Sequence, residues 1–308
     1  MKACMLDAYL IQVRKVRTRK ATGALEMGQF DGSTNLGDVL HQIGKKLGSY
    51  RKIDFLQRSF CIKNLKKSGD VITGILNVGE YGLACDVIDI TDGTVKYSKK
   101  KHEIVPAPYF FMFVLPSKGK CGLLCLQRFG VNGVKGIMEW VFGGMFQKNF
   151  TDYTIDIMNV VPAELMREFV ANGAVQEISV LKHEIPADIA QKFGGSHKRY
   201  EGIVEYTIRP RDKSLFKKSG LMTYVDGTKP LEQIFDFADF EYDTVKAKVD
   251  IGGRERIVDL TRPSRFNATF DVTDDVTEGK DGYPTVDSLE QVFFKMARSL
   301  GKRVGIVI

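Results

Sequence analysis

The sequence predicts an α+β protein of mostly antiparallel sheets with a few covering helices, in two domains joined by a flexible hinge. Three observations indicate this class. Strand-like segments outnumber helix-like ones, and several alternate apolar with polar residues, as half-buried antiparallel strands do. At 308 residues and 44% hydrophobic content, the chain can fill two medium-sized cores. A glycine pair, Gly194-Gly195, interrupts the periodic pattern in the second half and is the expected hinge.

In the first part of the chain we expect strands at 8–13, 71–78 and 85–90, and two helices. The segment 33–48 starts with Ser, Thr and Asn, which cap helices, and places Leu36, Leu40 and Ile43 on one face. This pattern predicts a surface helix. The segment 133–146 is apolar almost all round, which predicts a buried helix.

The stretch from Pro106 to Gly130 differs from the other strand-like segments because its two apolar runs do not alternate. They are joined by a Ser-Lys-Gly-Lys turn at 117–120. Continuous apolar runs of this length are typical of strands that are covered on both faces. We therefore predict a hairpin in the middle of a sheet, where it forms core and not a ligand pocket.

Further along, strands are expected at 153–161, 175–183 and 201–208, and helices at 161–173 and 186–193. A possible hairpin over 244–260 turns at Gly252-Gly253. The last helix, 287–301, is expected to open with an Asp-x-x-Glu capping box and to close at Gly301. A boundary near 190–198 would give a basic N-terminal domain, 1–192, and a C-terminal domain, 193–308.

Several classes of protein are disfavoured by what the chain contains. Its longest apolar run is too short for a membrane-spanning helix, and its start does not have the pattern of a secretory signal. The five cysteines form no C-x-x-C pair, and the four histidines share no ligand spacing with them. We therefore expect a cytoplasmic protein with reduced thiols, no cofactor and no metal.

Charge is distributed unevenly along the chain. Residues 1–150 carry 23 Lys and Arg against 12 Asp and Glu, a net of +11, whereas residues 151–308 carry 22 against 26, a net of −4. A half this basic attracts polyanions, so nucleic acid or an acidic membrane surface is the expected partner. The alternative is that these charges only keep a surface solvated.

Basic residues cluster at four places in the sequence. Mobile cations on loops and strand ends suit phosphate groups, whereas base reading needs shaped groups and motifs that are absent from this sequence. The pattern therefore favours binding to the backbone of double-stranded DNA without sequence preference. The expected contact residues are Arg14, Lys15, Arg17, Arg19 and Lys20; Lys99, Lys100 and Lys101; Arg209, Arg211, Lys213, Lys217 and Lys218; and Arg254 and Arg256.

A metal-dependent nuclease is the alternative function. Nucleases of this kind need acidic oxygens and a lysine near the scissile phosphate. The segment 240–250 supplies both, although alternating charge on the solvent face of a hairpin has the same appearance. Its candidate residues are Glu241, Asp243, Lys246, Lys248 and Asp250.

The order of elements resembles the RexA type of phage-exclusion protein, the partner of a membrane protein in a two-component abortive-infection system. The similar parts are "YLIQVRKVRTRK", the apolar stretch ending in Gly122–Gly130, "IVEYTIRPRDKSLFKK", and "VKAKVDIGGRERIVDL" followed by "DGYPTVDSL" and a terminal helix. The resemblance implies a homodimeric, non-enzymatic binder of double-stranded DNA with a small membrane protein as partner. It also implies DNA contacts at the basic residues of 209–218 and, with different spacing, at those of 14–20.

Overall fold

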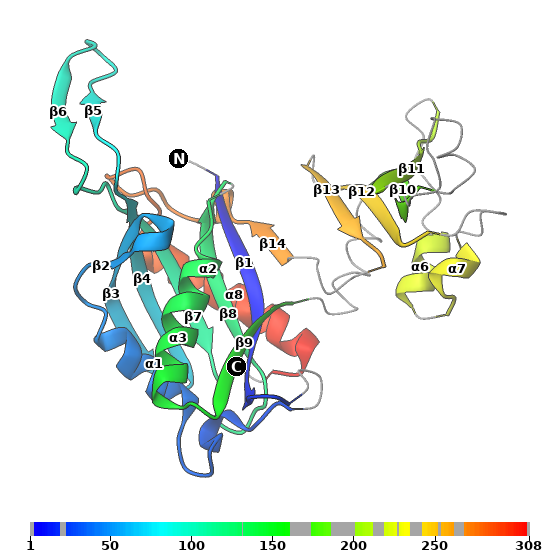
Figure 1. Ribbon diagram of the computed structural model, residues 1–308, viewed down its shortest axis with the longest axis horizontal. Helices are drawn as coiled ribbons and strands as arrows, with labels where there is room; N and C mark the ends of the chain where they lie inside the picture. The colour runs from blue at the N-terminus through cyan, green and yellow to red at the C-terminus, as the bar shows by residue number, and fades with distance from the viewer. Residues whose placement is uncertain are drawn as a thin grey trace. The chain divides into compact units, whose positions relative to one another are not determined.

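The computed structural model describes residues 3–18, 23–130, 132–160, 174–185, 201–211, 219–226, 228–234, 242–251, 254–261 and 268–306 (Figure 1). The chain forms two compact units. Unit 1 comprises Met1–Met158 together with Ala268–Ile308, and unit 2 comprises Asn159–Asn267. This division differs from the expected domains 1–192 and 193–308. Unit 2 begins earlier, and the chain returns to unit 1 after it. The expected hinge at Gly194-Gly195 and the expected helices at 161–173 and 186–193 lie outside the described residues.

Unit 1 is built on an eight-stranded sheet of order β14-β1-β8-β7-β4-β3-β2, with β9 also pairing with β1. The pairs whose register is defined are all antiparallel, which confirms that part of the predicted fold class. The strands are β1 (Cys4–Lys15), β2 (Arg51–Ile53), β3 (Arg58–Ser68), β4 (Val71–Glu80), β7 (Ala107–Val114), β8 (Gly122–Phe129), β9 (Tyr153–Asn159) and β14 (Ala268–Asp271).

The last strand and helix of the chain return to unit 1 because β14 pairs with the first strand. Met5 lies opposite Asp271, and Ala8 lies opposite Ala268. The Thr269 hydroxyl donates to the buried Asp7 carboxylate at 2.6 Å. Such a pairing joins residues 260 or more positions apart, so no local pattern in the sequence indicates it.

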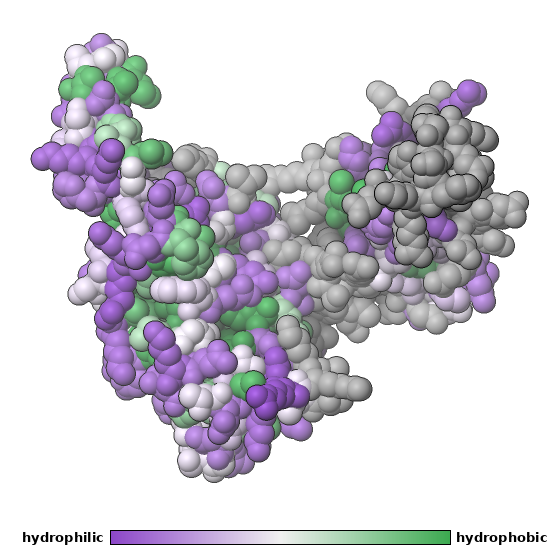
Figure 2. Space-filling model, in the orientation of Figure 1, coloured by the Kyte–Doolittle hydropathy of each residue, from purple (hydrophilic) through white to green (hydrophobic). Residues whose placement is uncertain are grey.

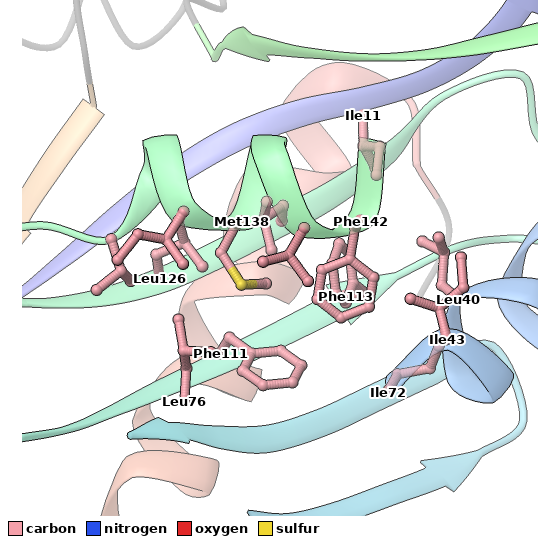
Figure 3. Close-up of a cluster of buried hydrophobic side chains, with 14 of the residues drawn as sticks. Ile11, Leu40, Ile43, Ile72, Leu76, Phe111, Phe113, Leu126, Met138 and Phe142 are labelled. Atoms are coloured by element: carbon pink, nitrogen blue, oxygen red, sulfur yellow. The ribbon is translucent and has the colours of Figure 1, made fainter. Parts of the chain in front are cut away.

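The hairpin predicted within 106–130 is confirmed as β7 and β8, at the centre of the sheet with both faces covered. On one face, Phe111 and Phe113 meet Phe142, with ring centroids 6.2 and 5.2 Å apart (Figure 3). On the other face, Phe110 packs edge-on against Phe293 of the terminal helix at 4.9 Å. Alternate residues of β7 thus enter two different packing layers, which explains why its sequence is apolar throughout.

Gly74 on β4 makes room for this packing. It lies opposite Phe111 in the sheet, and a Cβ atom at this position would come within 2.7 Å of the Phe111 ring. Phe111 is fully buried and held by two other phenylalanine rings, so it has little freedom to move aside. The glycine is therefore required by the size of its cross-strand neighbour.

Helices cover both faces of the sheet. Helix α1 (Leu36–Lys45) contacts β3 and β4, and the continuous helical run of α2 (Lys135–Met138), a π-helical turn η3 (Glu139–Gly143) and α3 (Gly144–Asn149) lies beside α1. Helix α8 (Val286–Val304) contacts β7 and β8 from the opposite face. Three short 3-10 turns complete the unit: η1 (Met27–Gln29), η2 (Asp54–Leu56) and η5 (Thr273–Asp275).

The helix ends follow the prediction for α1 but not for α8. Asn35 caps α1, its side chain accepting from the Asp38 amide at 3.2 Å. Helix α8 begins after Thr285 instead, and Glu290 of the expected capping box lies within reach of Lys66 and Thr73. The helix also runs past Gly301 and ends at Gly305, which adopts the left-handed conformation that glycine accepts at no steric cost.

Between β4 and β7 the chain leaves the sheet to form a separate hairpin, β5 (Cys85–Ile88) and β6 (Val95–Lys99). This is the projecting ribbon at the upper left of Figure 1, and Figure 2 shows hydrophobic side chains on it. A strand was expected at 85–90, and the four residues of β5 are all exposed. The hairpin is therefore not a part of the core.

Unit 2 contains a four-stranded antiparallel sheet of order β11-β10-β12-β13. Its elements are β10 (Ala174–Glu184), β11 (Glu201–Ile208), α6 (Ser219–Val225), α7 (Leu231–Ile234), β12 (Thr244–Ile251) and β13 (Arg254–Asp259). The β12–β13 pair confirms the hairpin expected over 244–260; Gly252-Gly253 lie outside the described residues. Val180, Val245 and Val258 belong to a core of its own.

Candidate nucleic-acid interface

Unit 1 contains a groove of about 590 Å³ between the C-terminal end of α1, the edge strand β2 and the outer side of η3 and α3. Four cationic side chains line it, and none of the lining residues, all of which the structure describes, is acidic. The lining residues are Lys46, Leu47, Arg51, Lys52, Phe60, Trp140, Val141, Gly144, Met145, Lys148 and Asn149.

The end of α1 positions the first two cations. Lys46 is the C-cap residue of the helix, where exposed carbonyl groups favour positive charge. Arg51 donates from Nη2 to the carbonyl oxygen of Lys46 at 3.1 Å, so the guanidinium is held against the helix end. Lys63 ties the following turn by donating to the carbonyl of Gly48 at 2.8 Å. The cationic wall of the groove is therefore attached to fixed backbone.

The other two cations come from β2 and α3. Lys52 follows Arg51 on β2, and its ammonium lies 5.4 Å from the centroid of the Tyr81 ring. Lys148 belongs to the last turn of α3 and is exposed. The cations thus come from three elements that are separate in sequence, and the fold brings them to one groove.

The nearby carboxylates have other partners. Asp54 accepts from the Tyr81 hydroxyl at 2.6 Å, a hydrogen bond that raises the pKa of Tyr81. Glu139 pairs with Lys135 one helical turn away at 3.4 Å. Both carboxylates thus have partners of their own, and neither lines the groove, so the charged groups of the lining are all positive.

The wall opposite α1 carries Trp140, the single tryptophan of the chain. The segment 133–146 was predicted to be a buried helix, and this is wrong for its outer side: Trp140 is 47% exposed and Glu139 is exposed. The buried residues of this run recur every three or four positions and so form one helix face, which leaves Glu139 and Trp140 on the outer side; they are Val134, Ile137, Met138, Val141, Phe142 and Phe146. Trp140 also belongs to the π-helical turn, and such turns are frequent at functional sites.

Phe55, in the 3-10 turn after β2, is 71% exposed next to Trp140. The two ring centroids are 6.0 Å apart and the ring planes are inclined by 60°. The rings touch without stacking, so their faces stay accessible. Two exposed aromatic rings beside four cations form an arrangement that suits a ligand with both planar rings and phosphates.

Glycine keeps the groove open. Gly144 lines it, and a Cβ atom added there would meet no atom within 4 Å. Gly136, on the same helical run but outside the lining, has equally open surroundings. A larger side chain at either position can therefore be accommodated, but only at Gly144 would it occupy the groove.

Two of the contact residues expected in unit 1 have partners within the fold. Arg14 is 14% exposed and pairs with Asp156 through two hydrogen bonds, at 2.5 and 3.2 Å. Lys99 is buried and donates to the carbonyl oxygens of Leu83 and Glu103, at 2.9 and 2.8 Å. These bonds hold both side chains within the fold; their expected role as DNA contacts stays a prediction. Lys15, Arg17, Lys100 and Lys101 are exposed.

The expected contacts of unit 2 are described only in part. Arg209 is 71% exposed and donates to Glu177 at 2.5 Å, an interaction that raises the pKa of the guanidinium. Arg211 is exposed, and Arg254 and Arg256 lie on β13. The remaining expected residues lie outside the described residues; they are Arg19, Lys20, Lys213, Lys217 and Lys218.

The residues of the alternative, a nuclease site, lie on or next to β12. The Asp243 carboxylate accepts from the backbone amide of His183 at 2.7 Å. Lys246 and Lys248 are half-buried and lie on one face of β12. The buried Val245, Ala247 and Val249 lie on the other face. Glu241 and the side chain of Asp250 lie outside the described residues. Within the described parts of the chain, no cluster of three or more His, Cys, Asp or Glu side chains could hold a metal ion.

The two units differ in charge. Unit 1 contains 28 Lys and Arg against 21 Asp and Glu, a net of +7, and unit 2 contains 17 of each, a net of zero. The positive charge of the protein therefore resides in unit 1, which carries the groove. No helix in the described residues is long and apolar enough to cross a membrane.

The sequence indicated the groove only weakly. Its cations are spread along the sequence: Lys46 follows Lys45, Arg51 and Lys52 are adjacent, and Lys148 is isolated. The interleaving of Tyr50, Arg51, Lys52 and Phe55 is the one local signal, since basic residues alternating with aromatic ones are typical of nucleic-acid surfaces.

No family model matches this chain, and neither a curated protein nor a solved structure matches it.

Proposed function

We propose that the protein binds nucleic acid without sequence preference, through the cationic groove of unit 1. The observation that supports this function is the convergence of Lys46, Arg51, Lys52 and Lys148 on one groove whose lining contains no carboxylate. Phosphate groups neutralise such side chains and release counterions, which provides affinity without reading bases. Duplex DNA is the expected polymer.

The test is the salt dependence of binding, measured by fluorescence anisotropy on 30-base-pair duplexes of unrelated sequence. If the four groove cations each contact one phosphate, the slope of log K against log salt is about −3.6. Affinity then falls about 150-fold between 50 and 200 mM salt, and each further contact steepens the slope by about 0.9. Binding that ignores salt, or that strongly prefers one duplex, would contradict the proposal.

A matched pair of variants tests the location. Lys52→Ala with Lys148→Ala should flatten the slope by about 1.8. Lys118→Ala with Lys120→Ala removes the same charge from the exposed turn between β7 and β8, where Ser117 contacts the N-cap residue of α1. That turn is at the other end of α1 from the groove, about 15 Å along the helix axis. If both variants lose DNA affinity equally, binding depends on the overall positive charge of the protein and not on contacts in the groove.

For the cellular role, we propose a DNA-binding sensor in a phage-exclusion system, as the resemblance to RexA-type proteins implies. In this proposal the protein is a non-enzymatic homodimer that signals to a small membrane protein. The test is phage plating on cells that carry the gene alone or with its neighbouring genes. Plaque reduction that requires both this gene and a neighbouring gene for a membrane protein supports the role; no effect of the gene on any phage tested contradicts it.

A further inference from the structure

Two features of the groove are not needed for contact with a duplex backbone. Trp140 and Phe55 are large, exposed rings, 47% and 71% accessible, and their inclination of 60° prevents them from covering each other. A ligand with a planar apolar face would gain binding free energy by covering them. Phosphates and sugars offer no planar apolar surface for this purpose, whereas nucleobases do.

A paired duplex keeps its base faces stacked inside the helix, so only an unpaired nucleotide can present a free face to a protein ring. The groove volume of about 590 Å³ is within the usual range for ligand pockets, about 300–1,000 Å³. The ring of Trp140 and the cations of Lys148 and Arg51 line the same cavity. A base and its own phosphates can therefore be bound together.

We infer that the groove binds an unpaired nucleotide of a single-stranded nucleic acid, with its base stacked on Trp140 and its phosphates among Lys46, Arg51, Lys52 and Lys148. The inference rests on the proposed function and specifies its ligand. The protein then has a higher affinity for single-stranded DNA than for continuous duplex of the same charge.

The tryptophan itself provides the measurement. Because Trp140 is the single tryptophan of the chain, its fluorescence reports this groove alone when it is excited at a wavelength that tyrosine does not absorb. A 15-nucleotide oligo(dT) should quench the fluorescence and shift its maximum, and a blunt 15-base-pair duplex should change it much less. Trp140→Ala should weaken oligo(dT) binding about ten-fold by anisotropy and leave long-duplex binding within two-fold, since stacking contributes about 1–3 kcal/mol per base. Trp140→Tyr should restore most of the loss.

Two glycine variants separate blocking of the groove from damage to the helix. Gly144→Leu would place a side chain in the groove, and Gly136→Leu would place the same side chain on the same helical run outside it. We expect unchanged circular dichroism for both variants and loss of oligo(dT) quenching for Gly144→Leu alone. Equal quenching by the two variants would overturn the inference.

The remaining outcomes distinguish the inference from the proposed function. If the wild type binds long duplex with a steep salt slope but Trp140→Ala leaves oligo(dT) affinity unchanged, the stacking inference fails and the proposed function stands. If neither oligo(dT) nor duplex binds at 50 mM salt, both fail. If thymidine monophosphate quenches Trp140 at the same concentration as oligo(dT), the ligand is a free nucleotide and the inference of a strand is wrong.

Discussion

At the scale of single residues, the same side-chain type performs two different tasks in this protein. Arg14 and Lys99 satisfy carboxylate and carbonyl groups in the interior, whereas Arg51 and Lys148 line an open groove. Arg14, Lys99 and Arg51 all have basic neighbours in the sequence, so that property does not distinguish the two tasks. The difference lies in the acceptors. The carboxylate that pairs with Arg14 is distant along the chain, whereas the carbonyl groups that accept from Lys99 are close in sequence.

Arg14 provides the first test at this scale. Gln12 and Arg14 both donate to Asp156, which is 8% exposed, so removal of the guanidinium takes a charged donor away from a largely buried carboxylate. Arg14→Ala should destabilise the protein by about 3 kcal/mol, measured by urea unfolding. Its salt slope for DNA binding should equal that of the wild type. A stable Arg14→Ala protein that binds DNA weakly would restore Arg14 as a contact residue.

At the scale of elements, the central hairpin has the properties expected of its sequence. The apolar runs of β7 and β8 are covered on both sides, and Phe111 and Leu124 are fully buried. Cys125 on β8 is also fully buried, and this burial raises the pKa of its thiol to about 12. The helical run beside them is less simple, since its outer side exposes Trp140 on an otherwise apolar segment.

The hairpin is tested by cavity formation and by overpacking. Phe111→Ala and Leu124→Ala should each cost about 3 kcal/mol and lower the yield of folded protein, because each leaves a cavity in the core. Gly74→Ala should also destabilise, by about 1–3 kcal/mol, because its methyl group would come within 2.7 Å of the Phe111 ring. The measurement is thermal unfolding. A Phe111→Ala protein with wild-type stability and selective loss of DNA binding would contradict the assignment of this hairpin to the core.

At the scale of the whole molecule, unit 1 is formed by the first and last segments of the sequence, and unit 2 is formed by the segment between them in sequence. Strand β14 and helix α8 complete the sheet and core of unit 1 after 109 residues of unit 2. Charge follows the same division, since unit 2 is neutral and unit 1 carries the net charge of +7. Folding of unit 1 therefore requires the C-terminal segment, and every residue that lines the groove belongs to unit 1.

Replacing 159–267 by a Gly-Ser linker tests this organisation. We expect a folded protein that keeps most of its DNA affinity and its salt slope, because the groove residues and the net charge remain. Truncation after residue 267 should instead give insoluble protein, because Phe110 and other residues on that face of the sheet lose the cover of α8. If the linker variant folds but does not bind DNA, the contact surface lies in unit 2. That unit contains the basic residues of 209–218, which the sequence predicts to be DNA contacts.

Sequence alone determined the features that depend on neighbouring residues. Antiparallel strands, the β7–β8 hairpin and the Asn35 cap follow from alternation, apolar runs and local hydrogen bonds. Tertiary structure alone decided the domain division, because β14 pairs with β1 across most of the chain, and it alone assembled the groove. Lys46, Arg51 and Lys148 come from separate elements, and whether a cation faces solvent or a buried carboxylate depends on contacts that local sequence does not encode.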